Sequence, residues 1–299
     1  MTQDLWPVAL KALQALGAHY GPAMDQAAAA AGLKTTEWRG WLLAALTFAP
    51  EPISAERLRL RTPYAATQAF EERLANAARQ GWLTPIRGDE YRLTEAGWYA
   101  AQRIVEAAYA AMASLQPLPP ADLARLIAHL YRLVEASLAA PQPPGKWCIA
   151  HSRRIARGDE ASPAERIDQY LSDLGAYRDD AHLAAWQPYG LSGQAWEALT
   201  CLWRGEANSL DELCLKLQRR GHSRETYAEA LQDLVKRGLV AEKAGTYRLT
   251  EQGKMLRQEA EEATDRYFYA PWAGLSEGEM HELRDLLTRL AEGLRRPEP

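Results

Sequence analysis

The sequence predicts a mainly α-helical protein made of two tandem copies of one unit, each with a small β-hairpin. Three observations support this fold class. The 299-residue chain is rich in Ala and Leu and poor in Val and Ile, a mixture that favours helix over sheet. Apolar residues recur at spacings of three and four over most of the chain. Finally, one short segment occurs twice, at 90–97 and again at 246–253.

The repeated segment indicates a tandem duplication. It reads EYRLTEAG in the first copy and TYRLTEQG in the second. Upstream, Gly32-Leu33 and Trp38 correspond to Gly190-Leu191 and Trp196, and the alignment needs only two one-residue gaps. Because agreement continues in both directions from one motif, we interpret the whole unit as repeated.

A cluster of prolines and a glycine at 141–145 interrupts the helical pattern, which places a Pro-rich, basic linker at residues 139–162. We therefore expect a first unit over residues 1–138 and a second over residues 163–299. The basic residues of the linker are interpreted as part of a solvated loop or, alternatively, as a basic arm; they are Arg153, Arg154 and Arg157.

The second unit is the clearer copy. Apolar spacing predicts helices over residues 163–187 and 192–204. A third helix is expected between Ser209 and Gly221, with Glu212 as the capping-box partner of Ser209. A fourth is expected between Ser223 and Gly238, since Ser favours helix starts and Gly favours helix ends.

Two short strands should follow, on either side of a turn at Gly245. Thr250 then caps a long helix that runs to about Tyr269, and a last helix opens at Ser276. The first unit repeats this order, with Thr62-Pro63 between two helices and Gly88-Asp89 at the hairpin turn. A helix pair joined by a tight turn and followed by a hairpin is the winged form of the helix-turn-helix, so the sequence predicts two such units.

The two hairpin regions resemble the MarR family of winged-helix regulators. The segments ARQGWLTPIRGDEYRLTEAGWYAAQ and VKRGLVAEKAGTYRLTEQGKMLRQ are similar to its recognition-helix end, wing, Leu-Thr-x-x-Gly motif and long dimerisation helix. A closer resemblance, over the whole chain, is to the SalK-like proteins, which carry two MarR-like units in one chain; it rests also on YRDDAHLAAWQPYGLSGQAWEAL and EEATDRYFYAPWAGL. The resemblance implies an intramolecular pseudo-dimer whose two recognition helices address adjacent major grooves.

The wings depart from the MarR pattern, in which an Asp-x-Arg tip reaches the minor groove. Here the tips read PIRGDE at 85–90 and EKAG at 242–245. Each tip retains one basic residue, Arg87 or Lys243, as the expected wing contact.

We predict that double-stranded DNA contacts the helix-turn-helix pairs and the wings. Seven Arg oppose six acidic residues over 51–94, and nine basic residues oppose seven acidic ones over 204–250, so few phosphate contacts are expected. The predicted contact residues are Lys216, Arg219, Arg220, Ser223 and Arg224 in the second unit, Arg57, Arg59, Arg61, Thr67 and Gln68 in the first, and the two wing residues. The first recognition helix carries Glu71 and Glu72 and is interpreted as degenerate.

We also predict a small-molecule effector site between the winged lobes and the long helices, where MarR-type proteins bind ligands. Ten Trp exceed what a core of this size needs, and large aromatics with a polar edge can line a pocket. The predicted residues are Asp179, His182, Trp186, Tyr189, Trp196, Trp203, Tyr267, Tyr269 and Trp272. The alternative for the aromatic residues is ordinary packing between helices, and for His182 a structural or exposed role.

No catalytic signature is present: the sequence has no Gly-x-Ser-x-Gly, no phosphate-binding Gly-rich loop after a strand and no His-Glu-x-x-His. Its six His show no metal-ligand spacing. We therefore predict that the protein is not an enzyme and needs neither a metal nor another cofactor.

Charge, hydropathy and Cys content together indicate the cellular compartment of the protein. The net charge of −4 excludes a polybasic nucleic-acid coat. The start lacks a basic region, and no apolar run reaches the roughly 18 residues of a membrane span, so neither a signal peptide nor a membrane is expected. Three scattered Cys fit a reducing cytoplasm.

The sequence thus predicts a cytoplasmic, MarR-like transcriptional regulator that binds DNA and responds to a small aromatic or apolar ligand. The alternative is a winged-helix protein that has lost DNA binding and serves as a small-molecule-binding or protein-interaction module, because fold alone does not decide function.

Overall fold

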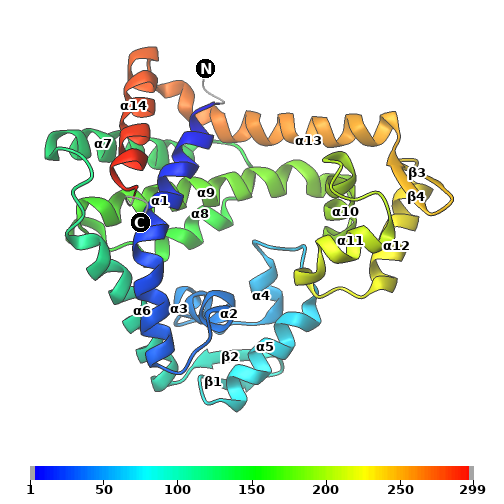
Figure 1. Cartoon of the computed structure of the whole chain (residues 1–299), viewed down its shortest axis with the longest axis horizontal. Helices are drawn as coiled ribbons and strands as arrows, with labels where there is room; N and C mark the ends of the chain where they lie inside the picture. Colours follow the sequence, from blue (N-terminus) through cyan, green and yellow to red (C-terminus); the bar gives the residue numbers. More distant parts are fainter. Residues whose placement is uncertain (1–3, 296–299) are drawn as a thin grey trace.

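The computed structural model describes residues 4–295, so the outermost predicted bounds, 1–3 and 296–299, lie outside it. The described chain is mainly helical with two two-stranded antiparallel sheets, which confirms the predicted fold class (Figure 1). The first half contains α1 (Leu5–Ala30), α2 (Thr35–Glu37), a π-helical turn (Trp38–Leu42), α3 (Leu43–Phe48), α4 (Ala55–Arg59), α5 (Thr67–Arg79), β1 (Leu83–Arg87), β2 (Glu90–Leu93), α6 (Glu95–Ala113) and α7 (Pro120–Ala139).

The second half has the same order of major elements after α8 (Trp147–Ser152), which lies in the predicted linker. It contains α9 (Pro163–Trp186), α10 (Gly193–Trp203), α11 (Leu210–Lys216), α12 (Arg224–Lys236), β3 (Val240–Lys243), β4 (Thr246–Leu249), α13 (Glu251–Tyr269) and α14 (Glu277–Gly293). We call residues 35–93 the first lobe and residues 193–249 the second lobe. In Figure 1 the first lobe lies at the bottom and the second at the right; α9 and α13 lie above the first lobe and reach the second, and α1 and α6 run down the left side.

Helix starts in the second half follow the predicted caps. The hydroxyls of Ser223 and Thr250 accept hydrogen bonds from backbone N–H groups in the first turns of α12 and α13. Ser209 likewise accepts from the Glu212 N–H at 3.3 Å. The Glu212 carboxylate, however, accepts from the N–H of Asn208 at 2.7 Å instead of that of Ser209. The predicted reciprocal capping box is therefore only half formed at α11.

The repeated Thr-x-x-Gly motif has a packing reason. The hydroxyl of Thr250 donates to the carbonyl of Gly238 at 2.6 Å, which ties the start of α13 to the end of α12. A Cβ added at Gly253 would lie 2.1 Å from the Leu239 carbonyl oxygen, and one at Gly97 would lie 2.2 Å from that of Trp82. Each long helix therefore crosses the chain just before its wing at a distance that only glycine permits.

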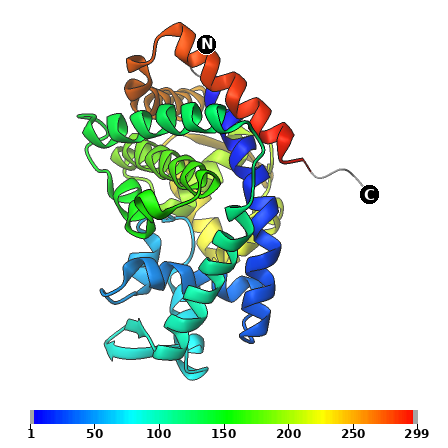
Figure 2. The ribbon, with the colours of Figure 1, turned by 90° about the vertical axis from the view of Figure 1, so that its left-hand side faces the viewer.

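The long helices of the two halves pack reciprocally. Helix α1 packs against α6 of its own half and against α14 of the other, whereas α9 packs against α13 of its own half and α7 of the other (Figures 1 and 2). A large core joins these helices with the first lobe. A separate cluster around Trp196, Leu199 and Leu231 fills the second lobe.

The linker is more ordered than predicted, because α8 inserts into it. Cys148 and Ile149 are buried, and their N–H groups donate to the carboxylate of Asp180 on α9 at 2.7 and 2.9 Å. The three linker arginines bind within the protein: Arg153 pairs with Asp173, Arg154 with Glu51, and Arg157 with Glu165. These ion pairs attach the linker to the rest of the protein. The three arginines are therefore part of neither a free basic arm nor a solvated loop.

Candidate functional site

The predicted recognition helix of the second lobe, α12, is amphipathic. Ser223 caps it, and Tyr227, Leu231 and Leu234 fill the lobe core. Its exposed polar side chains include both signs of charge; they are Arg224, Glu225, Glu229, Gln232 and Lys236. A phosphate backbone approaching α12 would therefore meet acidic as well as basic groups.

Most predicted DNA-contact residues of the second lobe have a partner within the protein. Lys216 pairs with Glu206 at 3.2 Å, and Arg224 pairs with Asp211. Arg220 is held by both carboxylate oxygens of Glu197, and its guanidinium lies over the ring of Tyr64 in the first lobe. Within residues 4–295, Arg219 and Lys243 are exposed and form no ion pair.

The first lobe uses its predicted contact residues in a similar way. Arg57 donates to the Pro52 carbonyl at 2.6 Å, and Arg59 to those of Ala65 and Pro63 at 3.1 and 3.2 Å. The remaining predicted residues are placed as follows: Arg61 pairs with Asp179 of α9 at 2.6 Å, Gln68 with Glu72 at 2.9 Å, Arg87 with Glu90 at 2.9 Å, and Thr67 opens α5. Arg59 thus shapes the loop before α5, whereas Arg57 holds the segment before α4.

The two lobes touch at the starts of their recognition helices. The backbone N–H of Ala66, just before α5, donates to the carbonyl of Arg220 at 2.8 Å. A ring nitrogen of His222, just before α12, lies 2.9 Å from the Tyr64 carbonyl oxygen. The resemblance implies recognition helices that address adjacent major grooves, whereas here the chain just before α5 contacts the turn before α12.

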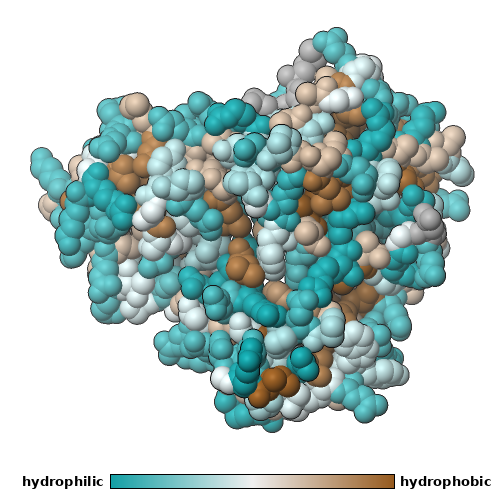
Figure 3. Space-filling view, turned by 180° about the vertical axis from the view of Figure 1, so that it is seen from behind, coloured by the Kyte–Doolittle hydropathy of each residue, from teal (hydrophilic) through white to brown (hydrophobic). Residues whose placement is uncertain are grey.

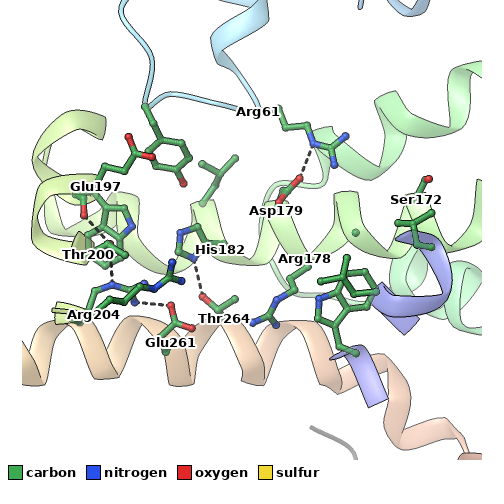
Figure 4. Close-up of a pocket in the computed structure, with 18 residues that line it drawn as sticks. Arg61, Ser172, Arg178, Asp179, His182, Glu197, Thr200, Arg204, Glu261 and Thr264 are labelled. Carbon is green, nitrogen blue, oxygen red and sulfur yellow. Dashed lines mark hydrogen bonds and ion pairs between the residues drawn. The ribbon is translucent and has the colours of Figure 1, made fainter. Parts of the chain in front are cut away.

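A cavity of about 640 Å³ opens above this contact, between the lobes and the long helices (Figure 4). Trp6, Leu10 and Leu13 of α1 form one wall. The others contain Arg61 and Tyr64 of the first lobe, residues of α9 from Ser172 to Leu183, Trp196, Glu197, Thr200 and Arg204 of α10, and Arg257, Glu261 and Thr264 of α13. Its place between lobes and long helices is the one predicted for an effector site.

Charged side chains contribute to several walls of the cavity. Arg257 is buried between the rings of Trp196 and Trp203, 4.8 Å from each centroid, and pairs with Glu261 at 2.6 Å. The lining contains four arginines, Arg61, Arg178, Arg204 and Arg257, and three carboxylates, Asp179, Glu197 and Glu261. Within the part of the chain that the structure describes, only Arg204 of these arginines has no ion-pair partner.

His182 faces this cavity in its neutral form. Burial lowers its pKa to about 4, and nearby Glu261 opposes that shift. Thr264 donates its hydroxyl proton to the Ala260 carbonyl at 2.8 Å, so it accepts from Nδ1–H of His182 at 3.4 Å. This leaves Nε2 of His182 unprotonated, as a hydrogen-bond acceptor.

The structure brings together only some of the predicted ligand residues. Asp179, His182 and Trp196 line the cavity. Trp186 and Tyr189 stack on Trp196 from outside it. The others lie elsewhere: Trp203 also borders a second hollow beside the wing, and Tyr267, Tyr269 and Trp272 pack at the junction of α13 and α14.

Sequence reasoning missed the α1 wall and Tyr64, because nothing local links them to α9. Among residues 4–295, no group of three or more His, Cys, Asp or Glu can hold a metal. On the face opposite that of Figure 1, the surface is mostly hydrophilic, and its apolar residues form separate patches (Figure 3).

A comparison with protein families adds an independent observation. A model of a helix-turn-helix family matches residues 155–297, a span that covers α9 to α14. No curated protein and no solved structure matches the chain. The second half is therefore similar to a helix-turn-helix family, in agreement with the order of its helices and hairpin. No helix within residues 4–295 is long and apolar enough to span a membrane.

Proposed function

We propose that the protein is a DNA-binding transcriptional regulator of the MarR type, built as an intramolecular pseudo-dimer from repeats 1–138 and 163–299 joined by the 139–162 linker. The observation that carries this proposal is the winged helix-turn-helix of the matched half, with exposed Arg219 before α12 and exposed Lys243 on the wing. The reciprocal packing of α1 on α14 and of α9 on α7 supports the pseudo-dimer, since two separate subunits would pair in the same way.

The ion pairs on this surface do not prevent DNA binding. Arg224 and Asp211 are largely exposed, and such pairs contribute about 0–1 kcal/mol. A DNA phosphate can therefore replace Asp211 as the partner of Arg224. Arg220 is different, because it is half-buried between Glu197 and Tyr64. We assign phosphate contact to Arg219, Arg224 and Lys243 and a structural role to Arg220.

We further propose that the cavity binds a small-molecule effector. Trp6, Leu10 and Leu13 offer surface to an apolar or aromatic body. Arg204 lacks an ion-pair partner among the described residues, so the cavity has one cation in excess, and Nε2 of His182 accepts a hydrogen bond. The occupant that fits is a small aromatic molecule with a donor group and one negative charge.

Fluorescence anisotropy tests DNA binding. The protein is titrated into a mixed-sequence duplex and into the DNA upstream of its own gene, at low and moderate salt. Binding that weakens with salt and is tighter for upstream DNA supports a regulator. Arg219→Ala should weaken binding and reduce the salt slope by about one phosphate contact. Lys11→Ala, which removes an exposed charge on α1, is the matched control and should change neither.

A second candidate function is a small-molecule-binding or protein-interaction module that has lost DNA binding. The contact between the starts of α5 and α12 favours it, as do the exposed acids Glu71, Glu72 and Glu225. In that case anisotropy stays flat even at low salt, while small aromatic acids still raise the melting temperature of the protein.

A further inference from the structure

Five contacts hold the first lobe around Tyr64, three of them to the second lobe and two to α9, and we call them together the lobe clasp. Two involve backbone carbonyls and are already described: the N–H of Ala66 donates to the Arg220 carbonyl, and a ring nitrogen of His222 contacts the Tyr64 carbonyl oxygen. The other three use side chains: Trp186 Nε1 donates to the Tyr64 hydroxyl at 3.2 Å, the Arg220 guanidinium lies 5.6 Å from the Tyr64 ring centroid, and Arg61 pairs with Asp179 at 2.6 Å. The clasp therefore combines backbone, aromatic and ionic interactions in one place.

Two glycines show that the lobes are closely fitted here. A Cβ at Gly193, the first residue of α10, would lie 2.2 Å from the Pro63 carbonyl oxygen. A Cβ at Gly221, which also has a positive φ of 75°, would lie 2.8 Å from that of Ala69. Neither neighbour is the end of a flexible side chain, so a larger residue at either position forces the lobes to shift.

The clasp sets the spacing of the two recognition helices. Dimeric helix-turn-helix proteins contact half-sites about 34 Å apart, with the N-terminal residues of each recognition helix on the bases. In this structure the residue just before α5, Ala66, donates a hydrogen bond to Arg220 in the turn before α12, and His222 of the same turn contacts Tyr64. The starts of both helices are therefore held close together, and they cannot reach two successive major grooves at once.

We propose that the lobe clasp is an autoinhibitory contact that must open before the two lobes bind DNA as a pair. This inference rests on the proposed function. The clasp also forms part of the cavity wall, because Arg61, Tyr64 and Asp179 belong to both. An occupant that displaces Tyr64 therefore acts directly on the spacing of the recognition helices.

The test opens the clasp without changing any residue that is predicted to contact DNA. Gly193→Ala places a methyl group against Pro63 while the helix start keeps its Ser192 cap. Gly278→Ala is the matched control: it lies in the first turn of Ser-capped α14, and a Cβ there meets nothing within 4 Å. Ala69→Leu, which wedges the clasp from α5, is the second opening variant.

Two measurements are made on each full-length variant. Hydrogen exchange of peptides that cover residues 64–69 reports clasp opening through the Ala66 amide and needs no DNA. Anisotropy with the upstream duplex reports affinity. We expect the Ala66 amide to exchange faster in Gly193→Ala and Ala69→Leu. We also expect both variants to bind DNA at least about tenfold more tightly, because the apparent affinity is reduced by the fraction of molecules with an open clasp, and that fraction is below about one tenth in the wild type. Gly278→Ala should match the wild type in both measurements.

The outcomes separate the two proposals. Faster exchange with unchanged or weaker DNA binding, in variants of a protein that does bind DNA, overturns autoinhibition and leaves the regulator intact. Faster exchange in variants that, like the wild type, bind no DNA even at low salt overturns the proposed function, and autoinhibition with it. Exchange that stays slow in both variants means that the lobes form one rigid unit, which also overturns the clasp as a switch.

Discussion

Replacing Arg257 by Met tests how the cavity wall is held. Arg257 is 1% exposed, and its guanidinium lies 4.8 Å from the ring centroids of both Trp196 and Trp203. Each cation–π contact contributes about 0.5–2 kcal/mol. The ion pair with Glu261 adds less than a fully buried pair, because Glu261 retains 29% exposure. Since Met keeps most of the packing volume, we expect a loss of about 2–4 kcal/mol in the free energy of unfolding.

Urea denaturation followed by circular dichroism measures this change as a lower midpoint at constant slope. Lys254→Met is the control, because Lys254 lies one turn earlier on α13 with its side chain 54% exposed. It should change the unfolding free energy by no more than about 0.5 kcal/mol. A loss below about 1 kcal/mol for the Arg257 variant would show that the two indole rings do not stabilise the guanidinium, and would refute the reasoning.

Three further predictions concern the same half of the chain. Gly253→Ala should lower the melting temperature, because its Cβ would lie 2.1 Å from a carbonyl oxygen, whereas Gly274→Ala, with nothing within 4 Å, should not. His182 has a folded pKa of about 4, below its usual 6.5, so the unfolded chain binds the proton more readily and stability falls as pH drops from 6.5 towards 4. His182→Gln should remove that part of the pH dependence. If urea titrations give the variant the same loss of unfolding free energy between pH 6.5 and 4 as the wild type, His182 is not its source. Ser223→Ala should cost about 1 kcal/mol through the lost α12 cap, and Ser223→Asp should restore stability but weaken DNA binding; equal DNA binding by both would exclude phosphate contact at this position.

The order of the fold could be predicted because its signals are local. Ser223, Thr250 and Gly238 act within one turn of their own helix, so spacing along the chain is enough to recognise them. Insertion of α8 was not predictable, since its N-terminal N–H groups are satisfied by Asp180, a residue of a different helix. Glu212 shows the same limit at short range: two backbone N–H groups lie within its reach, and the sequence cannot say which one it accepts from.

Of the residues that line the cavity, the sequence could place together only those on a single helix, α9. Asp179 and His182 share a face of α9, and helical periodicity therefore places both on the cavity side. Trp6 and Tyr64 come from α1 and from the loop before α5, and no pattern within either segment points to α9. The charge of the cavity was missed for a related reason, because an arginine in a sequence carries no sign of whether a carboxylate elsewhere in the chain will pair with it.

Arg219 and Arg220 illustrate why a cluster of charge in the sequence overestimates a DNA-binding surface. The two are adjacent and looked equivalent, yet Arg219 is exposed whereas Arg220 holds Glu197 and covers the ring of Tyr64. Arg220 thereby connects the turn before α12 to a residue of the cavity and to a residue of the other lobe. A guanidinium suits this position because its plane can stack on a ring while its edge binds a carboxylate bidentately. We therefore propose DNA contact for Arg219 and a role in lobe spacing for Arg220, which connects the proposed effector cavity to the turn before α12.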